Sequence, residues 1–228
     1  MTFDAALRAT EILLALAFLQ QCAEHIFKGR DTWLFAPRAI LSGALLCGVV
    51  TPCILLVLSL HSLLILRRFQ GPYNGGSDKM GLLILYCLSL AQWLPAGPMS
   101  EAALGYLAIQ VVLSYFISGQ VKIVNADWRS GRALQDVFLF SAYPVSENLR
   151  RLARQPRLLW AASWAVMGFE VIFPLAFFHA SFLYAALVIA AAFHIANACL
   201  FGLNRFVWVW IAAYPSLIWL QGRLIAPG

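Results

Sequence analysis

Residues 114–136 read SYFISGQVKIVNADWRSGRALQD. This segment begins inside an apolar run, contains several polar side chains and ends in a loop that bears arginines. Gln110, Ser114, Ser118 and Lys122 follow one another at steps of four, a spacing that places them on one face of a helix. Lipid offers such a stripe no hydrogen-bonding partner, so the stripe must face protein or a water-filled cavity. The segment therefore predicts a membrane helix whose polar face ends in an amine.

Apolar residues dominate the whole chain: 62% of the 228 residues are hydrophobic and 11% are charged. In soluble domains, about half of the residues are apolar and about a quarter are charged. Apolar runs of bilayer-spanning length recur from end to end, and no stretch is polar enough or long enough for a separate soluble domain. The composition predicts an all-α, polytopic membrane protein with one transmembrane domain over residues 1–228. About seven spans are expected, over residues 9–27, 39–66, 81–94, 103–122, 158–178, 182–203 and 206–220.

Two segments within this plan have special features. The expected span over residues 39–66 contains Thr51-Pro52, and the proline removes a helix hydrogen bond, so we expect a kink there. In the long loop after Lys122, residues 133–140 (ALQDVFLF) are expected to form a short amphipathic piece in the membrane interface. Residues 148–157 (NLRRLARQPR) are expected to lie against anionic lipid on the cytoplasmic side.

The basic residues gather in loops, as membrane topology requires. With seven spans and the N-terminus inside, twelve of the sixteen lysines and arginines fall on the inner side and four on the outer side. The positive-inside rule therefore predicts a cytoplasmic N-terminus and places Lys122 near the inner face. The net charge of +6 is modest and sits in these loops, so no nucleic-acid partner is expected. The N-terminus lacks the pattern of a removable signal peptide.

Three further polar residues lie inside expected spans. An ionised acid at mid-membrane costs roughly 2.5–3.5 kcal/mol, so Glu170 is expected to be neutral, paired with a base or in a wet cavity. His194 and Asn197 stand three residues apart on one helix. These three residues and Lys122 can also have purely structural roles. Lys122 can extend its amine to the membrane interface, Glu170 can hold helices together, and His194 with Asn197 can provide interhelical hydrogen bonds. The residue pattern alone leaves these alternatives open.

Metal, redox and phosphate-loop sites are not expected. The five cysteines lie in apolar runs and none belongs to a CxxC motif, which favours small buried residues over redox chemistry. No cluster of His, Cys and carboxylate residues has the spacing of metal ligands. The turn-rich loop over residues 67–80 lacks the GxxxxGK[ST] pattern of a phosphate loop, although its glycines and Asn74 force a tight backbone.

Two stretches resemble a specific family. Residues 115–128, YFISGQVKIVNADW, are similar to the YFIAG-(x)-K-(x)-ADW region of vitamin K-dependent gamma-carboxylases. Residues 193–215, FHIANACLFGLNRFVWVWIAAYP, are similar to their FHxxNxxLFxxxxF…P region. The loop YNGGSDKM, residues 73–80, is of the kind seen in bacterial members of the related HTTM (horizontally transferred transmembrane) domain superfamily. The resemblance covers most of the chain in the right order and implies an HTTM-like domain in a bacterial inner membrane.

In the carboxylase, the lysine that matches Lys122 acts on reduced vitamin K, so that reaction with oxygen yields an epoxide and a strong base. That base removes a proton from a glutamate side chain, which then takes up CO2. The resemblance thus implies a reduced quinone as cofactor, and an amine held in an apolar pocket can act as a neutral base. The candidate catalytic residues are Lys122, His194 and Glu170. The candidate substrate-binding residues are Asn197, Trp128, Asn74 and Ser118.

The chain also departs from the carboxylase pattern. One extra residue separates Lys122 from the ADW element, and Gly76 stands where the carboxylase loop has a histidine. The large luminal region that engages the carboxylase's peptide substrate has no counterpart in these residues. We therefore expect an enzyme of the lyase or quinol-dependent oxygenase kind that acts on a peptide or small molecule. The alternative is a non-catalytic accessory subunit that works with a membrane partner protein in peptide maturation or export. No internal repeat supports a transporter.

Overall fold

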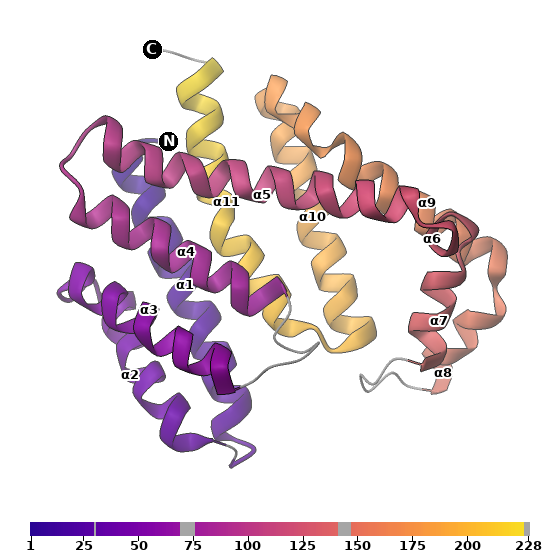
Figure 1. Cartoon of the computed structure of the whole chain (residues 1–228), viewed down its shortest axis with the longest axis horizontal. Helices are drawn as coiled ribbons and strands as arrows, with labels where there is room; N and C mark the ends of the chain where they lie inside the picture. Colours follow the sequence, from indigo (N-terminus) through magenta and orange to yellow (C-terminus); the bar gives the residue numbers. More distant parts are fainter. Residues whose placement is uncertain (30, 69–75, 141–146, 226–228) are drawn as a thin grey trace. The chain divides into compact units, whose positions relative to one another are not determined.

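The computed structural model describes residues 1–29, 31–68, 76–140 and 147–225, and its regular elements are all helices (Figure 1). This confirms the expected all-α class. Four helical segments within the described residues are long and apolar enough to cross a bilayer: Thr51–Arg68, Pro98–Val124, Pro156–Phe178 and Ala180–Phe201. The expected count of about seven spans is not confirmed, because the remaining long helices are shorter or more polar.

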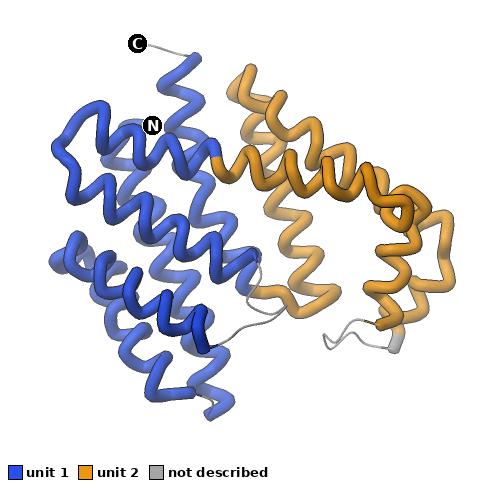
Figure 2. The backbone as a smooth tube through the Cα atoms, viewed as in Figure 1, with its two compact units in different colours: residues 1–109, 205–228 blue, residues 110–204 orange. Residues whose placement is uncertain are grey.

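The chain divides into two compact units (Figure 2). Unit 1 comprises residues 1–109 and 205–228, and unit 2 comprises residues 110–204. The helix α5 (Pro98–Val124) begins in unit 1 and continues into unit 2. Besides the first part of α5, unit 1 contains α1 (Phe3–Ile26), α2 (Thr32–Cys47), α3 (Thr51–Arg68), α4 (Gly76–Trp93) and nearly all of α11 (Asn204–Ile225).

The expected span over residues 39–66 is wrong: this region forms two helices, α2 and α3. Gly48 ends α2 in the left-handed region (φ +75°), and the N–H of Val49 donates to the carbonyl of Ala44 at 3.1 Å. Val50 also has a positive φ, of +40°. Pro52 then stands in the first turn of α3, where its missing N–H would have had no helical partner. The glycine stop and the proline start together break the helix, so there is no kinked single span.

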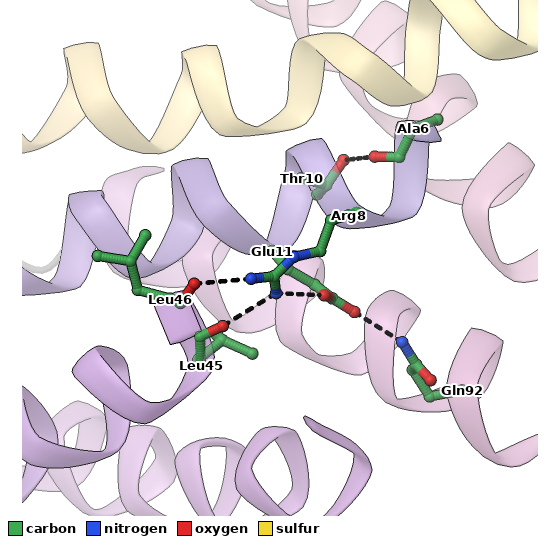
Figure 3. A network of polar contacts seen from close by, with 7 residues as sticks. All are labelled: Ala6, Arg8, Thr10, Glu11, Leu45, Leu46 and Gln92. Carbon is green, nitrogen blue, oxygen red and sulfur yellow. Dashed lines mark hydrogen bonds and ion pairs between the residues drawn. The ribbon is translucent and has the colours of Figure 1, made fainter. Parts of the chain in front are cut away.

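The polar network in Figure 3 fastens the first helices of unit 1 together. The Arg8 guanidinium on α1 donates to the carbonyls of Leu45 (3.0 Å) and Leu46 (2.6 Å) in the last turn of α2, and the Leu45 carbonyl also accepts from the N–H of Gly48 at 3.1 Å. It also pairs with Glu11 at 3.0 Å, and Glu11 accepts a 2.6 Å hydrogen bond from Gln92 on α4. Three helices are therefore joined through one buried carboxylate.

Unit 2 holds the second part of α5, followed by a run of short helices and two long ones. The short elements are α6 (Ala126–Ser130), α7 (Arg132–Phe140), α8 (Glu147–Arg150) and η2 (Arg151–Arg154), and the long ones are α9 (Pro156–Ile172), extended by η3 (Phe173–Phe178), and α10 (Ala180–Phe201). Residues 133–140 were expected to be a short amphipathic piece, and α7 is such a helix. Phe138 is buried against Ala153, Leu159 and Phe201, whereas Phe140 is 77% exposed.

Candidate functional site

An ion pair between Lys122 and Glu170 forms the centre of the candidate site in unit 2. The Nζ atom of Lys122, near the end of α5, donates to both carboxylate oxygens of Glu170 on α9, each at 2.6 Å. A third hydrogen bond from Nζ goes to Ser118 Oγ at 2.7 Å, and the Ser118 hydroxyl donates in turn to Glu170 at 3.2 Å. The side chains of Lys122 and Glu170 are 16% and 4% exposed. The structure thus brings together three residues that the sequence singled out.

The arrangement balances charge where water is scarce. A buried carboxylate or ammonium alone would be strongly destabilising, whereas each offsets the other when they are paired and their remaining hydrogen-bonding capacity is met. All three N–H groups of the Lys122 ammonium have a partner. Of the two sequence interpretations of Lys122, a snorkelling lysine does not fit, because its amine turns to a carboxylate on the neighbouring helix.

Gly119 allows α5 and α9 to approach closely enough for this pair. A Cβ atom at Gly119 would lie 2.8 Å from the Cβ of Glu170 and 2.9 Å from the backbone nitrogen of Val171. Real side chains do not come so close to backbone, so any larger residue would push the helices apart. The glycine in the quoted YFISG stretch is therefore part of the geometry of the ion pair.

Trp128 lies beside the same amine. Its ring centroid is 5.3 Å from Lys122 Nζ, within the range of a cation–π interaction. The short helix α6 holds it there: Asn125 caps the helix by accepting from the N–H of Asp127 at 2.8 Å, and Ser163 on α9 donates to the Trp128 carbonyl at 2.5 Å. The ADW element thus positions an aromatic ring beside the amine.

His194 connects to the same face of α5 through a residue that the sequence analysis missed. The hydroxyl of Tyr115 hydrogen-bonds to His194 Nε2 at 2.9 Å, and Phe173 stacks on the Tyr115 ring with centroids 4.2 Å apart. Tyr115, Ser118 and Lys122 follow at steps of three and four. The step-of-four stripe pointed instead to Ser114, whose hydroxyl bonds back to the Gln110 carbonyl of its own helix at 2.7 Å. A mixed three-and-four step would have found Tyr115.

Among the described residues, the Asn197 side chain is not hydrogen-bonded to this cluster. The main-chain carbonyl of Asn197 accepts from the N–H groups that end α10, and its side chain makes no hydrogen bond to another described residue. Asn74 lies outside the described residues. Across the described ranges, no group of three or more His, Cys, Asp or Glu side chains could hold a metal ion.

Fold and site together define an integral membrane protein of helical type with a buried lysine–glutamate pair. Residues 97–220, just over half of the chain, match the model of the HTTM domain. The chain therefore belongs to the HTTM domain family, as its sequence motifs indicated. The match includes every site residue located above. No curated protein and no solved structure matches this chain.

Proposed function

We propose that this HTTM protein is an enzyme of the bacterial inner membrane that uses Lys122 as a base on a reduced quinone or another lipid-phase substrate. The proton transfer would drive the modification of a peptide or small molecule, by chemistry like that of the carboxylase. The observation that carries the proposal is the position of the Lys122 amine: it is mostly buried, paired with Glu170 and close to the Trp128 ring. An amine held in position by a carboxylate can act in general acid–base catalysis when a substrate comes within hydrogen-bonding distance.

The ion pair itself can supply the base. An ammonium cannot accept a proton, but Nζ lies 2.6 Å from the Glu170 oxygens, so its proton can pass to the carboxylate. The product is a neutral amine beside a neutral acid, so that the transfer leaves no unpaired charge buried. Lys122 Nζ then takes a proton from a substrate hydroxyl, while the proton on Glu170 stays in place. The new ammonium compensates the negative charge left on the substrate oxygen.

The residues around Lys122 fit an aromatic diol. The amine can meet a ring hydroxyl, the Trp128 face can stack on the ring, and Ser118 can replace a hydrogen bond that Nζ gives up. A reduced quinone, when bound, would supply the reducing equivalents that convert oxygen into a strong base, as the resemblance implies. The protein would orient the ring, exclude water and hold the proton on Nζ.

The test is to incubate the purified protein with a reduced naphthoquinone and oxygen and to measure the quinone epoxide by mass spectrometry. Lys122→Ala should abolish epoxide formation, and Lys79→Ala, at an exposed lysine of α4, is the matched control and should not. Absence of epoxide from folded native protein that binds the quinol would count against the proposed chemistry.

The second candidate is a non-catalytic accessory subunit for peptide maturation or export. The observation in its favour is that Glu170 and Ser118 already occupy all three N–H groups of Lys122, as expected of a purely structural pair. A scaffold of this kind would keep its partner protein after Lys122→Met with Glu170→Leu, which removes the charges and retains the side-chain volume. Co-purification from the native membrane measures this directly.

A further inference from the structure

The two ends of unit 1 can be told apart by contacts between helix termini. At one end, Asp31 at the start of α2 pairs with Arg68 at the end of α3 at 3.4 Å. At the same end, Glu24 near the end of α1 pairs with Arg205 at the start of α11 at 3.2 Å, and Gln21 donates to Asp78 at the start of α4 at 3.1 Å. We call this the basic end of unit 1.

The opposite end carries the N-terminus, and we call it the N-terminal end. Arg8 at the start of α1 binds the last carbonyls of α2, as Figure 3 shows. The indole N–H of Trp93 at the end of α4 donates to the Pro52 carbonyl at the start of α3, at 3.3 Å. Glu101 at the start of α5 pairs with Arg223 at the end of α11 at 3.4 Å. Neighbouring helices from α1 to α4 are therefore antiparallel.

The cations are divided unequally between these ends. The basic end holds five cations among its described residues, Lys28, Arg67, Arg68, Lys79 and Arg205, whereas the N-terminal end holds Arg8 and Arg223. Both cations at the N-terminal end are paired with glutamates. Lys28, Arg67 and Lys79 are exposed, and within the described part of the chain they form no ion pair. The basic end thus presents free positive charge at its surface.

Exposed tryptophans mark both ends as membrane boundaries. Trp33, 64% exposed, lies in the first turn of α2 at the basic end, and Trp93, 58% exposed, lies at the N-terminal end. Tryptophan prefers the level of the lipid headgroups on either side of a bilayer. Between these ends runs α3, which qualifies as a membrane span. The free cations of the basic end therefore lie at the depth of lipid headgroups.

We propose that the basic end of unit 1 is its cytoplasmic surface, where Lys28, Arg67 and Lys79 bind the anionic headgroups of the inner leaflet, and that the N-terminus lies on the outer side. Positively charged loops are retained in the cytoplasm, and surface cations there are attracted to acidic phospholipids. The proposal is independent of any catalytic role of Lys122.

This proposed orientation is opposite to the cytoplasmic N-terminus that the sequence predicted. That expectation counted residues 39–66 as one crossing, whereas the structure has two antiparallel helices there, α2 and α3, and the N-terminus lies at the end of unit 1 opposite its free cations. Counted along the chain, one span, α5, separates Glu101 from Arg129. Two spans, α9 with η3 and then α10, separate Arg157 from Arg205. The arginine-rich loop then falls on the cytoplasmic side together with the basic end.

Cysteine accessibility tests the orientation. In a chain with its five cysteines replaced by serine or alanine, Thr2→Cys probes the N-terminal end and Lys28→Cys probes the basic end. In sealed spheroplasts, a membrane-impermeant maleimide should label Thr2→Cys and leave Lys28→Cys unlabelled until the membrane is permeabilised. The reverse pattern would overturn the proposal. Labelling of both positions in sealed spheroplasts would also overturn it, because the bilayer would then not separate the two ends.

Lipid binding tests the headgroup contact. Native mass spectrometry measures how much phosphatidylglycerol and how much phosphatidylcholine the purified chain binds. The native chain is compared with a variant that carries Lys28→Gln, Arg67→Gln and Lys79→Gln. Preference for the acidic lipid should fall roughly fivefold for each charge removed and should weaken in salt. The control Arg223→Gln, at the N-terminal end, should leave the preference unchanged. Equal losses in both variants, or no loss in either, would show that the basic end does not bind acidic lipid.

Discussion

The two units each contain a cation paired with a buried glutamate, and the pairs differ in what else the cation binds. Arg8 in unit 1 donates to Glu11 and to two main-chain carbonyls at the end of α2. Within the described ranges, Lys122 in unit 2 forms hydrogen bonds only with side chains, those of Glu170 and Ser118. A guanidinium stays protonated in proteins and presents a fixed fork of donors, whereas an amine can lose its proton.

The difference separates a structural role for the Arg8 pair from the proton transfer that we propose for the Lys122 pair. The Arg8 pair closes the end of one helix against another and lies outside the residues that match the HTTM model. The Lys122 pair lies inside them, and its cation is one whose charge can be switched. We infer that the first pair holds unit 1 together and that the second serves the chemistry of the protein.

The largest effect is expected on the reaction rate when the amine of Lys122 is replaced. Lys122→Arg keeps a cation beside Glu170 but cannot provide a neutral base, so the epoxide assay should lose about 10²- to 10⁴-fold in rate, the usual contribution of a general base. The control is the reverse exchange in the other ion pair, Arg8→Lys, which should leave the rate of epoxide formation unchanged. Full activity in Lys122→Arg would show that only the charge matters and would remove Lys122 from the chemistry.

The next effect concerns stability, where the two pairs should behave alike. Glu170→Ala and Glu11→Ala each leave a cation without its carboxylate, and removing one partner of a buried pair typically costs about 3–5 kcal/mol. Because Lys122 is less exposed than Arg8 (16% against 37% of the side chain), Glu170→Ala should be the more harmful. Unfolding by denaturant in mild detergent compares the two. A larger loss in Glu11→Ala would show that the main-chain contacts of Arg8 make its pair more important for stability.

A smaller effect is expected where α5 meets α9. Gly119→Ala places a methyl group 2.8–2.9 Å from Glu170 and Val171, and overpacking of this kind costs about 1–3 kcal/mol. The ion pair should lengthen as the helices separate, so activity should fall more than stability. Gly43→Ala in α2, where nothing lies within 4 Å of the added atom, is the control and should be neutral or slightly stabilising. Unchanged thermal stability and activity in Gly119→Ala would contradict the close approach of the helices.

The smallest effect is expected at Tyr115. Tyr115→Phe removes the hydroxyl that bonds to His194 and keeps the ring that stacks on Phe173, so it should cost about 1 kcal/mol, a typical single hydrogen bond. Activity distinguishes positioning from structure: a fall in rate that exceeds the fall in stability would mean that His194 must be held in place for the reaction. Equal small changes in both would assign Tyr115 and His194 to interhelical packing.

Most features that depend on residues close together in the sequence could be predicted. The apolar content predicted a helical membrane protein, and the YFISGQVKIVNADW stretch predicted a polar helix face with Lys122 at its end. The break between α2 and α3 was missed because Pro52 was considered without Gly48. Each alone is compatible with a kinked helix, and only together do they stop one helix and start the next.

By itself, the sequence determined the class of protein, its family motifs and the lysine at the centre of the site. These depend on composition and on spacing along one helix. Only the tertiary structure decided that Glu170, 48 residues away, is the partner of Lys122 and that Tyr115 and not Ser114 belongs to the site. It also showed that the Asn197 side chain forms no hydrogen bond with the site among the described residues. The physical reason is that helix periodicity fixes which residues share a face, whereas the packing of one helix on another, here permitted by Gly119, fixes which faces meet.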